Sequence, residues 1–96
     1  MKLVSVLKSD REGKKYMAKF SLGDDKQKTV HFGSVTSQTY LDHKDPKKRE
    51  NYIKRHRVRE DFNDPKTAGS LSRWLLWGDS TNLKTNVTSF RKKFDL

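Results

Sequence analysis

The sequence predicts an α+β fold, in which a three-stranded antiparallel meander is followed by three helices that pack on one face of the sheet. The first third of the chain holds short runs of strand-forming residues separated by turn residues, and the second half holds apolar residues at helical spacing. The 96 residues suffice for a single modest core. We expect one domain over residues 1–96, divided into a β-meander at 1–33, a loop at 34–45 and a helical part at 46–96.

The three expected strands are short and amphipathic. Residues 2–8 are rich in Leu and Val, residues 15–22 alternate between the two faces, and residues 28–33 follow a Gly-Asp-Asp turn. The side chains expected on the core face are Tyr16, Ala18, Phe20, Leu22, Val30 and Phe32, with Met17, Lys19, Ser21 and His31 on the other face. Such alternation is typical of an antiparallel sheet that is covered on one side.

Residues 34–44 show neither helical nor strand periodicity, so we expect a loop there. Asp45-Pro46 then predicts a helix start, because Asp accepts hydrogen bonds at the N-cap and Pro suits the first helical position. This helix should end near Arg57. Its apolar stripe is thin, with Tyr52 and Ile53 as the main members, and the rest of its surface is basic.

The apolar centre of the chain is residues 68–78, which we expect to form a helix buried between the sheet and the last helix. Leu71, Trp74 and Leu75 are spaced for one helical face, and two indoles would supply much of a small core. A last helix over 81–94 should pack through Leu83, Val87, Phe90 and Phe94. The expected caps and stop are Thr67 or Ser70 for the core helix, Gly78 at its end, and Ser80 or Thr81 for the last helix.

The overall charge predicts an acidic partner. Lys and Arg total 22 against 12 acidic residues, a net charge of +10, which suits nucleic acid, an anionic membrane surface or an acidic protein. The absence of Cys excludes disulfide frameworks and thiolate metal sites. No run approaches the ~18–20 apolar residues of a membrane span, and the last helix offers too little apolar surface to lie on a membrane. We therefore expect no membrane association and an intracellular setting.

Positive charge is concentrated at residues 44–59, which hold eight basic residues against two acids. Charge that serves only solubility usually mixes both signs, whereas a basic helix can follow the phosphates of a nucleic-acid groove. We predict phosphate contacts here; the alternative is a solvated face without a ligand. The candidate nucleic-acid-binding residues are Lys44, Lys47, Lys48, Arg49, Lys54, Arg55, Arg57 and Arg59, together with Arg91, Lys92 and Lys93 near the C-terminus.

The C-terminal cluster has an equally good alternative role, since basic residues at a helix C-terminus interact favourably with the helix dipole. No helix-turn-helix, zinc-finger or RNA-recognition signature is present in the chain. We therefore expect contacts that do not depend on nucleotide sequence.

Three histidines, His31, His43 and His56, could suggest a metal or nuclease site with Asp42 and Asp45. Their spacing matches no zinc motif, and no acidic cluster suited to Mg²⁺ is present. The chain also lacks a Ser-His-Asp or phosphate-loop pattern. We predict no catalytic residue, no metal and no cofactor, with His56 a half-buried hydrogen-bonding residue.

Several short motifs follow one another in a distinctive order. They are His31-Phe32-Gly33, His43-Lys44-Asp45, Arg55-His56, the run Asn63 to Gly69 and the run Ser72 to Trp77. Over about residues 15–94 the chain resembles an uncharacterised family of small basic proteins from large double-stranded DNA viruses of algae and protists. The resemblance implies a viral origin and no particular mechanism. The pattern of that family holds an aromatic and an acid where this chain has Ser37 and Thr39, and often a Trp in place of Phe62, which argues against a catalytic loop here.

These observations favour a non-enzymatic viral nucleic-acid-binding protein that makes phosphate contacts in genome packaging or organisation, with double-stranded DNA as the favoured partner. The alternative is a minor capsid-associated virion protein that bridges acidic protein surfaces. A third hypothesis is a nuclease-like factor. The expected location is the virion or the interior of the infected host cell, in its cytoplasm or nucleus.

Overall fold

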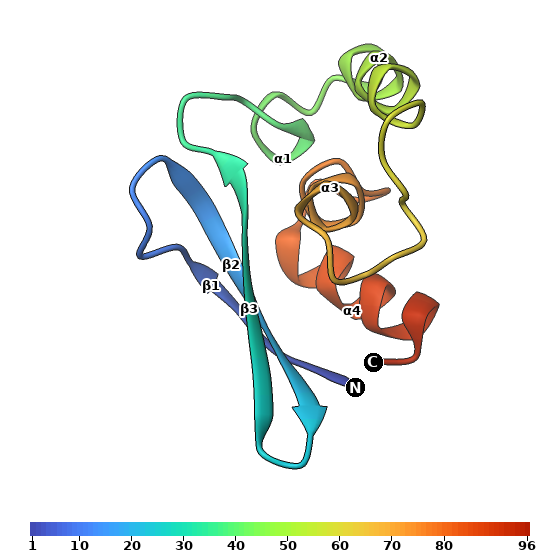
Figure 1. The fold of residues 1–96 in the computed structure, drawn as a ribbon. Coiled ribbons are helices and arrows are strands. Elements are labelled where there is room, and N and C mark those ends of the chain that lie inside the picture. Colours follow the sequence, from blue (N-terminus) through green and yellow to red (C-terminus); the bar gives the residue numbers. More distant parts are fainter.

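The computed structural model describes residues 1–96 and confirms the predicted α+β architecture. The elements are β1 (Lys2–Lys8), β2 (Lys14–Gly23), β3 (Lys26–Ser34), α1 (Tyr40–His43), α2 (Pro46–His56), α3 (Ala68–Leu71), the π-helical η1 (Ser72–Leu76) and α4 (Leu83–Phe94). Figure 1 shows the helices on one side of the sheet, with α3 and α4 against it and α2 beyond α3. Both termini lie at the same end of the molecule.

The sheet has the antiparallel order β1-β2-β3, and its core face matches the predicted alternation. Asp24 and Asp25 both have positive φ (49° and 64°), which forms a two-residue hairpin turn, so β3 begins at Lys26 and not at residue 28 as expected. Leu22 is the exception to the alternation, because its side chain is 41% exposed. Figure 1 shows the reason, since the β2–β3 hairpin projects beyond the helices.

The segment expected to be a loop contains the one-turn helix α1. Thr39 and Asp42 form a capping box, in which the backbone N–H of Thr39 donates to Oδ2 of Asp42 at 2.7 Å. This hydrogen bond, aided by the Lys15 ammonium 3.1 Å away, lowers the pKa of the Asp42 carboxyl. Lys44 then ends the helix in the left-handed conformation. A single turn is too short to show apolar periodicity, which is why the sequence did not reveal it.

The core helix begins as predicted and ends differently. Oγ1 of Thr67 accepts the Ser70 N–H at 3.1 Å, which confirms Thr67 as its cap. After Leu71 the helix widens, and the Trp77 N–H donates to the Ser72 carbonyl five residues earlier at 3.0 Å. The expectation of an α-helix up to residue 78 is therefore wrong, because residues 72–76 form a π-helix.

The two tryptophans flank the core and do not fill it, contrary to expectation. Leu71, Leu75 and Leu76 are fully buried, whereas Trp74 and Trp77 are half-buried. The Trp74 indole N–H donates to the Phe62 carbonyl at 2.8 Å, which holds this ring near the protein surface.

The last helix is capped by Asn82, whose side chain accepts the Thr85 N–H at 3.1 Å. The helix therefore starts at Leu83, and the expected cap at Ser80 or Thr81 is wrong. Its predicted stripe is confirmed: Phe90 is buried, and Leu83, Val87 and Phe94 pack on the core. A polar residue, Asn86, is also fully buried in this helix.

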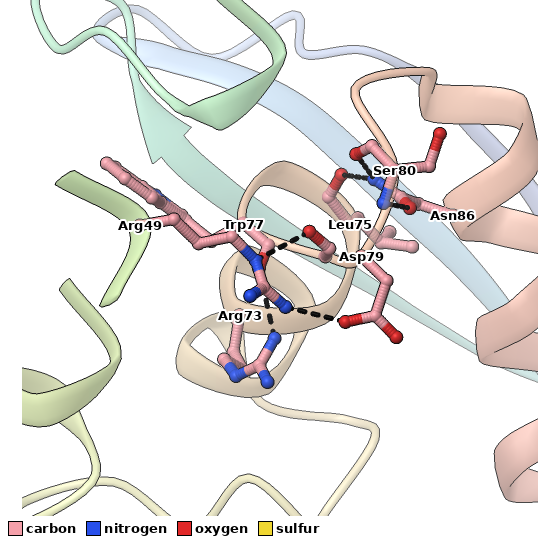
Figure 2. A network of polar contacts seen from close by, with 8 residues as sticks. Arg49, Arg73, Leu75, Trp77, Asp79, Ser80 and Asn86 are labelled. Atoms are coloured by element: carbon pink, nitrogen blue, oxygen red, sulfur yellow. Dashed lines mark hydrogen bonds and ion pairs between the residues drawn. The ribbon is translucent and has the colours of Figure 1, made fainter. Parts of the chain in front are cut away.

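Asn86 joins α4 to the end of η1 (Figure 2). Its Nδ2 donates to the carbonyls of Leu75 at 3.0 Å and Ser80 at 2.8 Å, and its Oδ1 accepts the Ser80 N–H at 3.1 Å. Gly78 lies in the enclosed turn, where a Cβ atom would collide with the Trp74 carbonyl and lie 2.8 Å from Cγ of Asn86. The Asn86 side chain therefore supplies hydrogen bonds that the end of the helix lacks.

Arg49 joins α2 to the same turn (Figure 2). Its Nε donates to the carbonyls of Gly78 at 2.9 Å and Trp77 at 3.2 Å, and Nη2 pairs with Asp79 at 2.6 Å. The Trp77 carbonyl also accepts from the Arg73 guanidinium at 3.0 Å. Burial, with the Arg49 charge nearby, lowers the pKa of Arg73. One turn of backbone thus receives side chains from both α2 and α4.

Replacing the buried amide should weaken the whole domain. Asn86→Ala leaves the buried Leu75 carbonyl without its donor, and an unpaired buried polar group costs about 1–3 kcal/mol. We expect a melting temperature at least about 4 °C lower in thermal denaturation followed by circular dichroism. Ser89→Ala, an exposed position of the same helix, is the control and should melt like the wild type.

Arg49→Gln should also destabilise the protein, by about 1.5–3 kcal/mol, because it removes charged hydrogen bonds to two backbone carbonyls. The neighbouring Lys48→Gln removes the same charge from an exposed side chain and should leave the free energy of unfolding unchanged in urea titrations. Equal stability of the two variants would contradict an anchoring role for Arg49.

Candidate functional site

α2 presents most of its cations to solvent. Oδ1 of Asp45 accepts the N–H groups of Lys47 at 2.9 Å and Lys48 at 3.4 Å, which confirms the predicted cap. No residue of α2 is fully buried, so the helix is held by a few contacts along one side. The sequence explains why this helix buries so little surface, because charged residues surround an apolar stripe of only Tyr52 and Ile53.

The cations of α2 differ in their partners. Lys47, Lys48, Arg55 and the capping residue Arg57 are exposed and form no ion pair with the protein. Lys54 pairs with Glu50 at 3.0 Å, but exposed pairs of this kind contribute little to stability and exchange readily. Most of the predicted phosphate-binding residues on α2 are therefore free to meet an anion.

Two predicted binding residues are committed to internal contacts. Arg49 anchors α2 to the turn after η1, and the Arg91 guanidinium donates to the Leu3 carbonyl at 3.0 Å, which joins α4 to β1. Lys93 lies 4.4 Å from the centre of the Trp74 ring, where its charge interacts with the ring face.

The remaining predicted binding residues lie just outside α2 or near the end of α4. Lys44 and Arg59 are exposed on either side of α2, and Lys92 is exposed near the end of α4. Figure 1 shows α4 on the other side of α3 from α2. The structure thus gathers the cations of residues 44–59 and leaves the cluster of residues 91–93 apart from them.

Four aromatic side chains, two of them from α2, form a ladder of neighbouring rings. The rings of Tyr52 and Trp77 are parallel within 3° with centroids 4.2 Å apart, and the His56 ring stacks on the outer side of Tyr52 at 4.1 Å. His43 contacts Trp77 at a ring distance of 5.2 Å. Tyr52 and His56 are four residues apart in one helix, a spacing that brings their side chains together, whereas Trp77 and His43 join them only through the tertiary fold.

Two adjoining hollows lie beside this ladder, and we call them together the α2 cleft. The first, of about 600 Å³, is lined by Gln38, His43, Lys48, Asn51, Lys54, Arg55 and Trp77. The second, of about 460 Å³, shares Gln38, Arg55 and Trp77 with the first and extends past Tyr52, His56 and Glu60 to Lys14. The cleft is therefore walled by α2 on one side and by the segment after β3 on the other.

Two buried atoms of cleft residues lack hydrogen-bond partners: Nε2 of His43 and Oε2 of Glu60. Nδ1 of His43 accepts the Asp45 N–H at 3.0 Å, so the proton of the neutral ring resides on Nε2. The Glu60 carboxylate lies over Gly69, where a Cβ atom would be 2.7 Å from Oε2. The cleft thus has an unused donor and an unused acceptor beneath its surface.

Tyr52 is a neutral member of the site. Burial, with the nearby Glu60 charge, raises the pKa of its hydroxyl to about 12. Its phenol therefore stays protonated at neutral pH, and the positive charge of the cleft comes from Lys and Arg.

The sequence reading missed Lys14, Gln38 and Asn51 as cleft residues. Asn51 stands three residues after Lys48 and four before Arg55, so helical spacing alone could have placed it on their face. Lys14 and Gln38 carry no such signal, because they come from other elements.

The histidines do not converge. His31 lies on the outer face of the sheet, where its Nδ1 is 2.7 Å from the Ser9 hydroxyl, while His43 and His56 lie at opposite ends of the ladder. No three His, Cys, Asp or Glu side chains come together as potential metal ligands. None of the helices combines the length and apolar character needed to cross a membrane.

Comparison with known proteins gives a family and no activity. No curated protein and no solved structure matches the chain significantly. A model of a family of unknown function, DUF5754, matches residues 4–56, which include most of β1 and the whole of β2, β3, α1 and α2. Because this match covers more than half of the chain, the protein belongs to the DUF5754 family.

Proposed function

We propose that the protein binds nucleic acid through phosphate contacts that do not depend on nucleotide sequence, made chiefly by α2. The observation that carries the proposal is that Lys47, Lys48, Arg55 and Arg57 have no internal ion pair, although the protein uses Arg49 and Arg91 internally. Free cations on an exposed helix are available to displace the counterions of a phosphate backbone.

The resemblance to small basic proteins of large DNA viruses supports a viral setting, and we propose genome packaging or organisation as the process. In the rival proposal, the same cations bind an acidic protein surface within a virion. The rivals differ in one measurable respect: only the first predicts affinity for bare nucleic acid.

Reversing charge on α2 provides the test of binding. Each phosphate contact on duplex DNA contributes about −0.9 to the slope of log K against log salt, so the α2 cations should give a slope of about −3 to −5. The double variant Lys54→Glu, Arg55→Glu should weaken binding to all sequences alike and make the slope shallower by about 2. Gel-shift titrations at several salt concentrations would measure both effects.

The matched control is Lys26→Glu, Lys28→Glu, which makes the same change in net charge. Both lysines are exposed at the β2–β3 hairpin, which Figure 1 shows at the other end of the molecule from α2. This pair should lose less affinity and keep the wild-type slope. No binding at low salt would favour the acidic-protein proposal, whereas equal effects of the two double variants would contradict phosphate contacts made chiefly by α2.

The proposed role includes no cleavage of the nucleic acid. We expect the purified protein to leave DNA and RNA intact with Mg²⁺, Mn²⁺ or Zn²⁺, because no cluster of potential metal ligands exists in the fold. Incubation with labelled substrates followed by denaturing electrophoresis would check this. Metal-dependent cleavage that His43→Ala abolishes would establish the nuclease hypothesis instead.

A further inference from the structure

We infer that the α2 cleft holds an unpaired nucleotide, so that the preferred partner is a single-stranded or locally opened nucleic acid. This inference rests on the proposed function and specifies its ligand. A rigid duplex can contact the exposed cations of α2, but its paired bases cannot enter a recess beside the helix. A flat surface would suffice for phosphate contacts, whereas a recess can also hold a base.

The size and position of the cleft suit one nucleotide. The larger hollow, of about 600 Å³, lies within the range of about 300–1,000 Å³ that small-molecule sites occupy. Lys48, Lys54 and Arg55 line it from α2, and Lys14 lines the adjoining hollow from β2. Cations therefore lie on both walls, where a phosphate would bind as its base enters the recess.

The uncharged groups of the cleft suit a base better than a second phosphate. Gln38 and Asn51 place amides on opposite walls, and an amide offers both a donor and an acceptor to the edge of a base. A paired base has already used that edge, whereas an unpaired base exposes it. The aromatic rings of Trp77 and His43, which contact each other, line the same hollow.

The unpaired atoms of the cleft point to the same ligand. Buried polar groups nearly always find partners, so the lone Nε2–H of His43 and the lone Oε2 of Glu60 require an explanation. His43 lines the first hollow and Glu60 the second, and one of the two atoms is a donor while the other is an acceptor. Every nucleobase carries both donors and acceptors, the two kinds of group that these atoms lack as partners.

The test compares a short labelled single strand of mixed sequence with the duplex of the same length, using fluorescence anisotropy and the full chain. The cleft variant Gln38→Ala, Asn51→Ala changes no charge and alters two exposed side chains. It should bind the single strand about tenfold more weakly, with duplex affinity and both salt slopes unchanged. The control Gln27→Ala, Asn63→Ala removes exposed amides outside the cleft and should change neither affinity.

The outcomes separate the two proposals. Equal effects of the cleft variant on single strand and duplex, or no effect on either, would overturn the inference while the salt-dependent binding remained. No binding of either nucleic acid at low salt would overturn the proposed function as well. Thymidine and adenosine monophosphates form a separate arm: they should compete only at concentrations far above the Kd of the strand. Competition at concentrations near the Kd of the strand would identify a free nucleotide as the ligand and would overturn the inference that the ligand is a polymer.

Discussion

The structure depends on how the carbonyl groups at the end of η1 obtain their hydrogen bonds. A helix end leaves its last carbonyls without partners, and here the Leu75 carbonyl is buried and those of Trp77 and Gly78 are partly buried. Asn86 from α4 and Arg49 from α2 supply the donors. The same few hydrogen bonds therefore close the core and hold both flanking helices. They matter because the domain has only twelve buried residues.

This arrangement also builds the cleft. Trp77 directly follows the π-helical turn, and its ring stacks on Tyr52 of α2. Because the stack and Arg49 hold α2 at that place, the helix stands beside the segment after β3 and leaves a recess between them. Wide turns of this kind often occur at functional sites, and here the turn sets the position of the basic helix.

The charge of the protein serves two purposes that a count of residues does not separate. Arg49, Arg73 and Arg91 donate to backbone carbonyls, a task for which a planar guanidinium with several N–H groups is well suited. Most of the lysines remain at the surface, where the ammonium stays hydrated. We propose that the free cations of α2 bind phosphates, and that the amides of Gln38 and Asn51 in the α2 cleft bind an unpaired base. Affinity would then be mainly electrostatic, and selectivity would come from a few uncharged groups.

Local features of the sequence determined much of the fold. Alternation gave the strands of the sheet, Asp45-Pro46 marked the start of α2, and Thr67 capped the core helix, because each of these signals acts over a few neighbouring residues. The sequence also located the basic helix. Only the tertiary structure decided which cations are free, that the core helix widens into a π-turn, and that Gln38 and Lys14 face α2. These outcomes depend on backbone carbonyls and side chains that are distant in the chain, and no local pattern records which of them meet.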